Sequence, residues 1–459
     1  MAFDIKSVLS EQAGRNYQLH AEHINPRFSR ALGIIGFDRC YVRAEGAYLW
    51  DQGGAKYLDT LAGYSVFNIG RNHPAVRRAL NDFMALDYPS LVQMEAPLLS
   101  GLLAEELKRR VGYGLERVYF TSAGAEGVES ALKFARRATG RTGIVFASSA
   151  FHGLTYGALA LNGVEAFREG FGPLLPDCHR VPFNDLEALE GALSGGDVAA
   201  VIVEPVQGKG VAIADDGYLA GATRLCRKYG TLLIVDEVQC GMGRTGRFLA
   251  VQHDPGAEPD MVVLSKSLSG GYVPVGAVLL RKEIHDKTYS SLDRAVVHSS
   301  TFGQGSLAMV AGLATLAVMD DEDLVAQAGA RGDALVRALT AMKDEFEFIH
   351  DVRGRGLMIG IEFAAPRSLK LKTAWKTANA LSKDLFCQAI TMPMLEDHHV
   401  LTQVAGNQMT TIKLTPPLII SDDDIAWFLG AFRDVMDRIH KFPGPAWDVI
   451  FRVARNAVS

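Results

Sequence analysis

The stretch LLIVDEVQCGMGRTG, residues 232–246, is the part of the sequence that best indicates the fold. It begins with four apolar residues, Leu232–Val235, which have the length and composition of a buried strand. A carboxylate, Asp236, follows directly. Because open α/β sheets bind ligands outside the carboxyl ends of their strands, this stretch predicts a buried strand that leads into a polar site.

Similar short apolar runs recur on both sides of this strand. They are Val118–Phe120, Gly143–Phe146, Val198–Val203, Met261–Leu264 and Ala277–Leu280. Amphipathic stretches separate several of these runs, and the one after Gly124 places apolar residues at helical spacing, namely Val128, Ala131, Leu132 and Ala135. This alternation predicts an α/β fold in which helices flank a mostly parallel sheet.

The two ends of the chain have a more mixed pattern. Helical spacing returns near the C-terminus, at Ile425, Phe428, Leu429, Phe432, Val435, Met436 and Ile439. We therefore expect a large domain at residues 71–325 and a smaller α+β domain built from residues 1–70 and 326–459.

Composition excludes several classes of protein. Of 459 residues, 48% are hydrophobic and 22% are charged, which rules out an intrinsically disordered chain. A net charge of −5 gives no reason to expect nucleic acid as a partner. Five scattered cysteines without a C-x-x-C pair predict a reducing compartment and no metal site. Because Met1–Ser10 lacks an apolar core and no long apolar run follows, we expect a cytoplasmic protein without a transmembrane segment.

Lys266 is the first candidate for chemistry, since it follows the run Met261–Leu264. Burial lowers the pKa of a lysine and makes it a nucleophile toward carbonyl groups. Lys282 also follows an apolar run, but Arg281 and Glu283 beside it indicate a solvated face. Asp236 is the second candidate: such a carboxylate can cap a helix, bind a metal or pair with a buried cation, for example a protonated pyridine nitrogen.

Two further segments are candidates for ligand binding. The turn Thr121–Ala125 joins a strand to a helix, and helix N-termini offer N–H groups to a phosphate. Phe151, in Phe151–Gly153, is able to stack on a planar ring or to pack in the core. Gly241–Gly246 matches G-x-G-x-x-G, but five residues separate it from the strand, which argues against dinucleotide binding.

Seven short motifs resemble, in the same order, those of the class III pyridoxal-phosphate aminotransferases of fold type I. They are FHG at 151–153, EPVQG at 204–208, DEVQCGMGRTG at 236–246, LSKSLSGG at 264–271, STFG at 300–303, VRGRGL at 352–357 and PPL at 416–418. The resemblance covers roughly residues 41–439. It implies the cofactor pyridoxal 5'-phosphate (PLP) and a homodimer with shared active sites.

The resemblance also implies residue roles. Lys266 would hold PLP as a Schiff base and move a proton between the substrate Cα and C4′ of the cofactor, while Asp236 would keep the pyridine nitrogen protonated. The other implied cofactor contacts are Phe151 and Val238 on the two ring faces, Gln239 at the phenolic oxygen, the N–H groups of Gly124 and Ala125 at the phosphate, and Thr301, which would reach the phosphate in the partner subunit.

Two departures from the family bear on the substrate. Lys209 stands where ornithine-type members have a glutamate, and Lys413 stands where they have a carboxylate-binding arginine. Two lysines cannot form the salt bridge of that pair, and a lysine lacks the bidentate fork of an arginine. We name Tyr64, Lys209 and Lys413 as candidate substrate residues. At the phosphate turn, Ser122–Ala125 replaces the common Asn-Ser-Gly-Thr, so a hydroxyl is lost and its N–H is kept.

We therefore expect a PLP-dependent aminotransferase that moves an amino group, preferably from a terminal amine, to an oxo acid or aldehyde. The pattern is similar to the putrescine, ornithine and acetylornithine group. One alternative is a bulky apolar aldehyde such as a hopanoid precursor, which the apolar segment Leu32–Phe37 and the C-terminal tail favour. Another is an aminomutase or racemase. Retention of the motif residues argues against a catalytically silent PLP-binding protein.

Two segments lie outside these motifs. We interpret residues 370–408, which carry Lys370, Lys372, Trp375, Lys376, His398 and His399, as a solvated surface insertion. The alternative is that this segment covers the substrate entrance. The C-terminal tail places apolar residues on one helix face, namely Trp447, Ile450, Phe451, Ala454 and Val458. We expect this tail to pack on its own domain rather than on a membrane.

Overall fold

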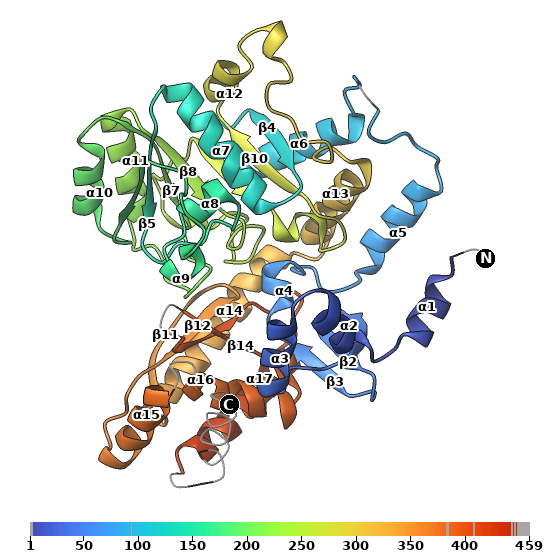
Figure 1. The fold of residues 1–459 in the computed structure, drawn as a ribbon, viewed down its shortest axis with the longest axis vertical. Coiled ribbons are helices and arrows are strands. Elements are labelled where there is room, and N and C mark those ends of the chain that lie inside the picture. The colour runs from blue at the N-terminus through green and yellow to red at the C-terminus, as the bar shows by residue number, and fades with distance from the viewer. Residues whose placement is uncertain are drawn as a thin grey trace.

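A computed structural model describes residues 3–92, 94–381, 385–406, 409–441, 444 and 447. Its centre is a seven-stranded sheet, in the upper half of Figure 1. Across the sheet the strands are β4 (Arg117–Thr121), β10 (Gly276–Leu280), β9 (Met261–Leu264), β8 (Leu232–Asp236), β7 (Val198–Val203), β5 (Gly143–Ala147) and β6 (Cys178–Val181). Only β10 runs antiparallel to its two neighbours, so the sheet is mostly parallel, as the sequence predicts.

Helices lie on both faces of this sheet, which explains why β5, β7, β9 and β10 are buried along their whole length. The helices of this part are α5 (Pro74–Met84), α6 (Leu98–Val111), α7 (Gly124–Thr139), α8 (Tyr156–Ala160), α9 (Glu165–Arg168), α10 (Leu186–Leu193), α11 (Tyr218–Tyr229), α12 (Lys282–Thr288) and α13 (Ser306–Asp321). The predicted apolar face of α7 is buried, including Val128, Ala131, Leu132 and Ala135.

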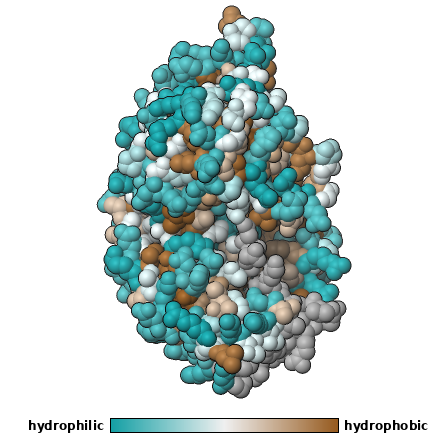
Figure 2. Space-filling model, turned by 90° about the vertical axis from the view of Figure 1, so that its left-hand side faces the viewer, coloured by the Kyte–Doolittle hydropathy of each residue, from teal (hydrophilic) through white to brown (hydrophobic). Residues whose placement is uncertain are grey.

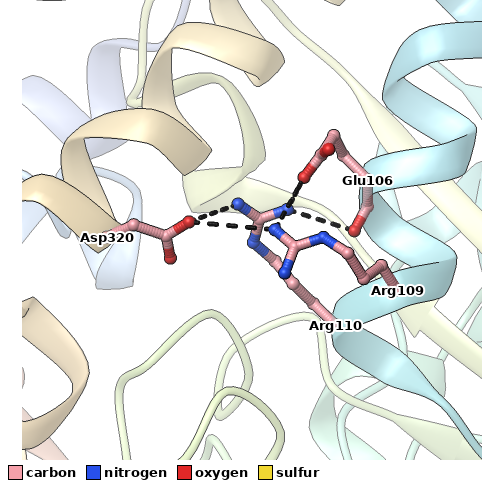
Figure 3. A network of polar contacts seen from close by, with 4 residues as sticks. All are labelled: Glu106, Arg109, Arg110 and Asp320. Carbon is pink, nitrogen blue, oxygen red and sulfur yellow. Dashed lines mark hydrogen bonds and ion pairs between the residues drawn. The ribbon is translucent and has the colours of Figure 1, made fainter.

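Ion pairs connect two of these helices. Arg110 of α6 binds Glu106 one turn earlier on the same helix and reaches Asp320 of α13, with 2.5 Å between the guanidinium and the carboxylate (Figure 3). Arg109 also binds Glu106, at 2.9 Å. The Arg110 side chain is 10% exposed and that of Asp320 is 61% exposed, so this ion pair joins α6 to α13 at the surface of the molecule.

Two four-stranded sheets lie in the lower half of Figure 1, and the first of them combines strands from both chain ends. The first sheet contains β1 (Tyr41–Glu45), β2 (Tyr48–Asp51), β3 (Lys56–Asp59) and β13 (Val400–Leu401). The second contains β11 (Ile349–Arg355), β12 (Met358–Phe363), β15 (Thr411–Leu414) and β14 (Gln403–Ala405). The parallel pairing of β3 with β13 joins the two ends of the chain directly. The exact division at residues 70 and 325 stays a prediction.

The helices of this lower part come from both chain ends as well. They are α1 (Ile5–Glu11), α2 (Asn16–His23), α3 (Pro26–Ile34), α4 (Ala62–Ser65), α14 (Leu324–Ala341), α15 (Leu369–Leu381), α16 (Leu385–Glu396) and α17 (Asp422–Ile439). Within the described residues, none of the helices is long and apolar enough to span a membrane. Figure 2 shows a side of the molecule that is mostly hydrophilic, with hydrophobic residues scattered over it.

The interpretation of residues 370–408 as a solvated insertion is wrong. Helix α16 is buried at almost every position, and Trp375 of α15 lies against Phe386, with 4.4 Å between the ring centroids. Strands β13 and β14 extend the two small sheets. The segment is part of the core because the lysines of α15 lie on its exposed side, whereas Leu371, Ala374, Trp375 and Ala378 are buried.

Beyond the end of α17 the structure describes residues 440, 441, 444 and 447, and Trp447 is the one of them on the predicted apolar face of the tail. This side chain is 1% exposed, and its indole N–H donates to the carbonyl oxygen of Ile439 at 2.9 Å. The prediction that the tail packs on its own domain is confirmed at Trp447. The other residues of the predicted apolar face, Ile450, Phe451, Ala454 and Val458, lie outside the described part of the chain.

Candidate active site

One edge of the large sheet brings the candidate residues together. The strands β4, β5, β7, β8 and β9 run in the same direction, so their carboxyl ends meet at this edge. They lead to residues that line one cavity of about 160 Å³, namely Gly124 and Ala125, Phe151 to Gly153, Glu204, Asp236, Val238 and Gln239, and Ser265 and Lys266. Seven of the eight predicted cofactor residues therefore lie in a single cavity.

Asp236 ends β8 and is 4% exposed. One of its carboxylate oxygens accepts the backbone N–H of Val238 at 2.9 Å, and the other lies 2.8 Å from Nδ1 of His152. Burial alone would lower the pKa of His152, but the hydrogen bond and the charge of Asp236 raise it above its ordinary value. Within the described structure Nε2 of His152 is buried without a partner, and His152 lines the same cavity as Asp236.

Glu204 follows β7 and was not among the predicted site residues. Its carboxylate accepts the N–H of Phe151 at 2.9 Å on one oxygen and the N–H of Gly208 at 2.7 Å on the other. Burial raises the pKa of Glu204 above its ordinary value, and the charge of Asp236 adds to this effect. Glu204 thus connects the loop that carries Phe151 to the loop that carries Lys209.

Lys266 begins a short 3-10 turn directly after β9. Its backbone has a φ of 45°, a conformation that non-glycine residues rarely adopt and that recurs at functional sites. Burial lowers the pKa of Lys266, and the negative charges of Asp236 and Glu204 oppose that change. A buried lysine with a lowered pKa at the end of a strand has the properties that the sequence analysis expects of a nucleophile, and this role of Lys266 stays a prediction.

A second and larger cavity, of about 310 Å³, opens beside the first. Phe151, Gln239 and Lys266 line both cavities and form their shared wall. The other lining residues are Tyr64, Phe167, Gly208, Lys209, Gln403, Ala405 and Lys413, which include all three predicted substrate residues. Lys413 and Gln403 are register partners on the adjacent strands β15 and β14.

A left-handed turn holds Tyr64 at this second cavity. The four residues Ala62–Ser65 have φ angles of 46°, 60°, 63° and 66°, and three of them are not glycine. Asp59 fixes the start of the turn by accepting the N–H groups of Leu61 and Ala62, both at 2.9 Å. Left-handed backbone costs roughly 1–2 kcal/mol for each non-glycine residue, so this turn stores strain at the site.

Thr301 lies away from both cavities in this single chain, on an exposed loop before α13. The contact of Thr301 with a phosphate in the partner subunit and the shared active sites stay predictions. Sequence reasoning missed Glu204, His152, Phe167 and Gln403 as site residues. His152 and Glu204 stand inside quoted motifs and follow apolar runs, which is a usable signal, whereas Phe167 and Gln403 come from segments without a motif.

Comparison with known proteins assigns this geometry to a family. The sequence profile described as Aminotransferase class-III matches residues 35–436. The chain belongs to the class-III aminotransferases. It is 35% identical to "Aminotransferase PigE" of Serratia sp. (strain ATCC 39006) over 472 residues, which is 95% of this chain and 55% of that relative, so the chain spans little more than half of the relative's length.

Solved structures of this family have the same architecture. The ornithine aminotransferase of Toxoplasma gondii ME49 superposes with a TM-score of 0.78 at 30% identity, covering 88% of this chain and 91% of that chain. An amine transaminase from an uncultivated Pseudomonas species, in its PLP-bound form, superposes with a TM-score of 0.75 at 28% identity, covering 87% of this chain and 95% of that chain. The prediction of PLP fold type I is confirmed.

The smaller cavity fits the PLP on which class-III aminotransferases depend. Gly124 begins α7, and the first N–H groups of a helix have no partner within it, so they are able to bind a phosphate. A Cβ added at Gly124 would lie 2.8 Å from a methyl group of Val238. The N-terminus of α7 at this residue, here called the Gly124 cradle, therefore leaves no space for a side chain. A lysine for the carbonyl and a carboxylate for the pyridine nitrogen complete the donor set.

Proposed function

We propose that this chain catalyses transamination between a primary amine or amino acid, with terminal amines preferred, and an oxo acid or aldehyde. The observation that supports it is that Lys266, Asp236 and the Gly124 cradle line one cavity that opens into a second, substrate-sized one. Over two half-reactions the two substrates exchange nitrogen for oxygen, so neither an oxidant nor net water is consumed.

Bound PLP supplies an electron sink for the negative charge that develops at the substrate Cα. Lys266 would remove the proton from that carbon and return it at C4′ of the cofactor, and its lowered pKa leaves more of its amine unprotonated and able to act as a base. Asp236 would keep the pyridine nitrogen of the cofactor protonated, and the hydrogen bond between His152 and Asp236 fixes the orientation of this carboxylate. Phe151, held by Glu204, forms the wall between the cofactor cavity and the substrate cavity.

The test uses the cofactor-loaded protein without an acceptor. Putrescine, ornithine, 4-aminobutyrate, glutamate, alanine and a long-chain primary amine are added separately, and conversion of the cofactor absorbance to the amine form is followed. Lys266→Ala should abolish turnover, and Lys282→Ala, which changes an exposed lysine of α12, is the matched control. The proposal fails if Lys266→Ala turns over at the normal rate, or if no donor converts the loaded cofactor.

We also propose that the chain forms a homodimer in which Thr301 of the partner subunit contacts the cofactor phosphate. Exposed apolar side chains concentrate on residues 84–102 and 292–307. Hydrogen bonds join these segments, from Ser306 to Ser90 at 3.2 Å and from Ser100 to Gln304 at 2.8 Å, so they form one surface. Scattered single hydrophobic residues need no partner, but a continuous patch of this kind does.

The mass of the protein in solution tests the dimer. Light scattering should give about twice 49.7 kDa. Leu292→Asp, at a side chain that is 96% exposed in one chain, should shift the mass toward the monomer and reduce cofactor retention. Thr301→Ala should weaken cofactor retention and leave the mass unchanged. A monomer that retains PLP and turns over normally would contradict the proposal.

A further inference from the structure

Four consecutive carbonyl groups in the loop after β7 accept hydrogen bonds from one of the two smaller sheets. They belong to residues 208–211, here called the clamped segment, and the donors belong to the sheet of β11, β12, β15 and β14, here called the C-terminal sheet. Nζ of Lys413 in β15 donates to the oxygen of Gly208 at 2.9 Å. The N–H of Gly406, directly after β14, donates to the oxygen of Lys209 at 2.7 Å.

Arg353 of β11 binds the other two carbonyl groups. Its Nη2 donates to the oxygen of Gly210 at 2.7 Å, and its Nε donates to that of Val211 at 2.9 Å. Asp351 and Glu362, which are register partners on β11 and β12, accept from Nη1 at 2.9 and 2.5 Å. Because a guanidinium is a planar fork of donors, Arg353 binds two carboxylates and two carbonyl groups at once.

The clamped segment has space on two sides. Lys209 lines the substrate cavity, whereas Gly210 lines a further cavity of about 160 Å³, which Arg353 also lines. A Cβ added at Gly210 would have Cα of Gly406 as its nearest neighbour, at 3.5 Å, so the backbone is loosely packed there. Val211 is buried but has a φ of 56°, which a β-branched residue keeps only where its surroundings hold it. The hydrogen bonds from the C-terminal sheet therefore fix the position of this segment.

The position of the clamped segment affects both cavities. Gly208 and Lys209 form part of the wall of the substrate cavity. The N–H of Gly208 donates to Glu204, which also holds the loop of Phe151. A Cβ added at Gly208 would overlap the amide of Gln239, so the backbone of the segment lies directly against a residue of the cofactor cavity. A shift of the segment would thus change the shape of the substrate cavity first.

We propose that Arg353 is a positioning residue for the substrate cavity, because it holds the clamped segment on the C-terminal sheet and so sets the place of Lys209 relative to Lys266. This inference rests on the transaminase function proposed above. Lys266 and Asp236 follow β9 and β8 of the large sheet, so they keep their places when the segment shifts. Loss of the clamp should therefore weaken substrate binding more than it slows the chemical step.

Arg353→Lys separates this role from a merely structural one. A lysine keeps the positive charge between Asp351 and Glu362, but its single ammonium lacks the fork that binds both carboxylates and both carbonyl groups. Arg353→Met also removes the charge and should have an effect at least as large. The matched control is Arg355→Lys on the same strand, where the arginine binds Asp216, whose side chain is 93% exposed.

Hydrogen exchange of the PLP-loaded protein, followed by mass spectrometry, tests the clamp without turnover. The N–H of Val211 donates to the carbonyl oxygen of Gln207 at 2.9 Å, so its exchange requires the segment to open. Arg353→Lys should raise the exchange rate of residues 208–211 at least about tenfold, the effect of one lost charge-assisted hydrogen bond. Arg355→Lys should leave this rate unchanged.

The first half-reaction tests the consequence for the substrate. In single turnovers, the concentration is varied of whichever donor in the series above converts the cofactor fastest. With Arg353→Lys, the donor concentration that gives half the limiting rate should rise about tenfold or more, and the limiting rate should fall less than about threefold. The free energy of unfolding in urea should stay close to that of the unaltered protein, since the ion pairs of β11 and β12 are kept.

Two results would overturn the inference. One is that neither Arg353 variant changes the exchange of residues 208–211. The other is that exchange becomes faster while the half-saturating donor concentration stays the same, or rises less than the limiting rate falls. Failure of the transaminase proposal looks different, because then no donor converts the cofactor of the unaltered protein, whereas Arg353→Lys still speeds the exchange of residues 208–211.

Discussion

The affinity of the larger cavity for a carboxylate ligand such as pentanoate should fall steeply above neutral pH, because only the protonated form of Lys413 attracts an anion. Burial, with the charges of Lys266 and Lys209, lowers the pKa of this lysine to about 7. The protonated fraction is then about 90% at pH 6 and about 1% at pH 9. Since apparent affinity scales with the fraction of the competent form, the Kd of pentanoate should rise about 90-fold over this interval.

Calorimetric titration of pentanoate at pH 6, 7, 8 and 9 measures this dependence, and the ligand stays ionised throughout because carboxylic acids titrate near pH 4 to 5. Pentan-1-ol at the same pH values is the neutral control, and its affinity should stay level. Lys413→Met should bind pentanoate weakly with little pH dependence. Lys413→Arg keeps a charge that burial cannot remove over this range, so it should bind pentanoate with a flatter profile.

The reasoning would be refuted by a pentanoate Kd that changes less than about threefold between pH 6 and 9, since a lysine with this pKa cannot stay protonated over that range. A Lys413→Met profile as steep as that of the unaltered protein would also refute it, because another group would then carry the dependence. Lys209→Met should lower the affinity and keep the steep fall.

Three further perturbations have defined outcomes. Arg244→Met should lower the free energy of unfolding by about 3 kcal/mol in urea titrations, because it leaves three buried acceptors without a donor, the carbonyl oxygens of Leu357 and Pro416 and the amide oxygen of Asn68. Burial raises the pKa of Glu237 from 4.5 to about 7, so the folded state binds the proton of this carboxyl more tightly than the unfolded state does. The protonated carboxyl therefore contributes about 3 kcal/mol to the free energy of unfolding below pH 4.5. This contribution is lost as the pH rises to about 7. Urea titrations across that window should show a smaller fall for Glu237→Gln, and an unchanged fall would exclude this carboxyl. Gly124→Ala should weaken PLP retention at least tenfold, because the new Cβ would press on Val238 2.8 Å away, whereas Gly430→Ala, whose Cβ would meet nothing within 4 Å, should leave retention unchanged.

The strands of the large sheet were predictable because a strand that is buried on both faces requires apolar residues at successive positions. All six predicted runs are strands. The seventh strand, β6 (Cys178–Val181), was missed because it lies at the sheet edge, where two of its four residues, His179 and Arg180, are exposed. An edge strand with a solvated face has no run of that kind.

Residues 370–408 were misinterpreted because their charged residues were given more weight than their apolar ones. Helix α16 has only one strongly polar side chain between Leu385 and Leu395, Gln388, which is the composition of a buried helix. Its Pro393, within the helix, obscures the pattern further because proline usually ends a helix. The exposed lysines of α15 likewise hid its buried face, which includes Trp375.

The cofactor cavity was predictable because its residues follow strands at the positions where a parallel sheet concentrates ligands. The substrate cavity was predictable only in part. Lys209 and Lys413 were named from motifs, but Phe167 and Gln403 reach the cavity through packing of α9 and β14 that no local pattern encodes. The charge of the cavity depends on which lysines and carboxylates the fold brings to its wall, and the sequence alone does not show this.

The left-handed turn Ala62–Ser65 links the thermal stability of the protein to the shape of its substrate cavity. Three non-glycine residues there hold a strained backbone, so replacement of Ala62 or Ser65 by glycine should release part of that strain and raise the melting temperature. Variants chosen only for heat resistance would therefore accumulate glycine at this turn. The backbone of these variants would also be more mobile at Tyr64, so higher thermal stability would be accompanied by weaker discrimination between substrates.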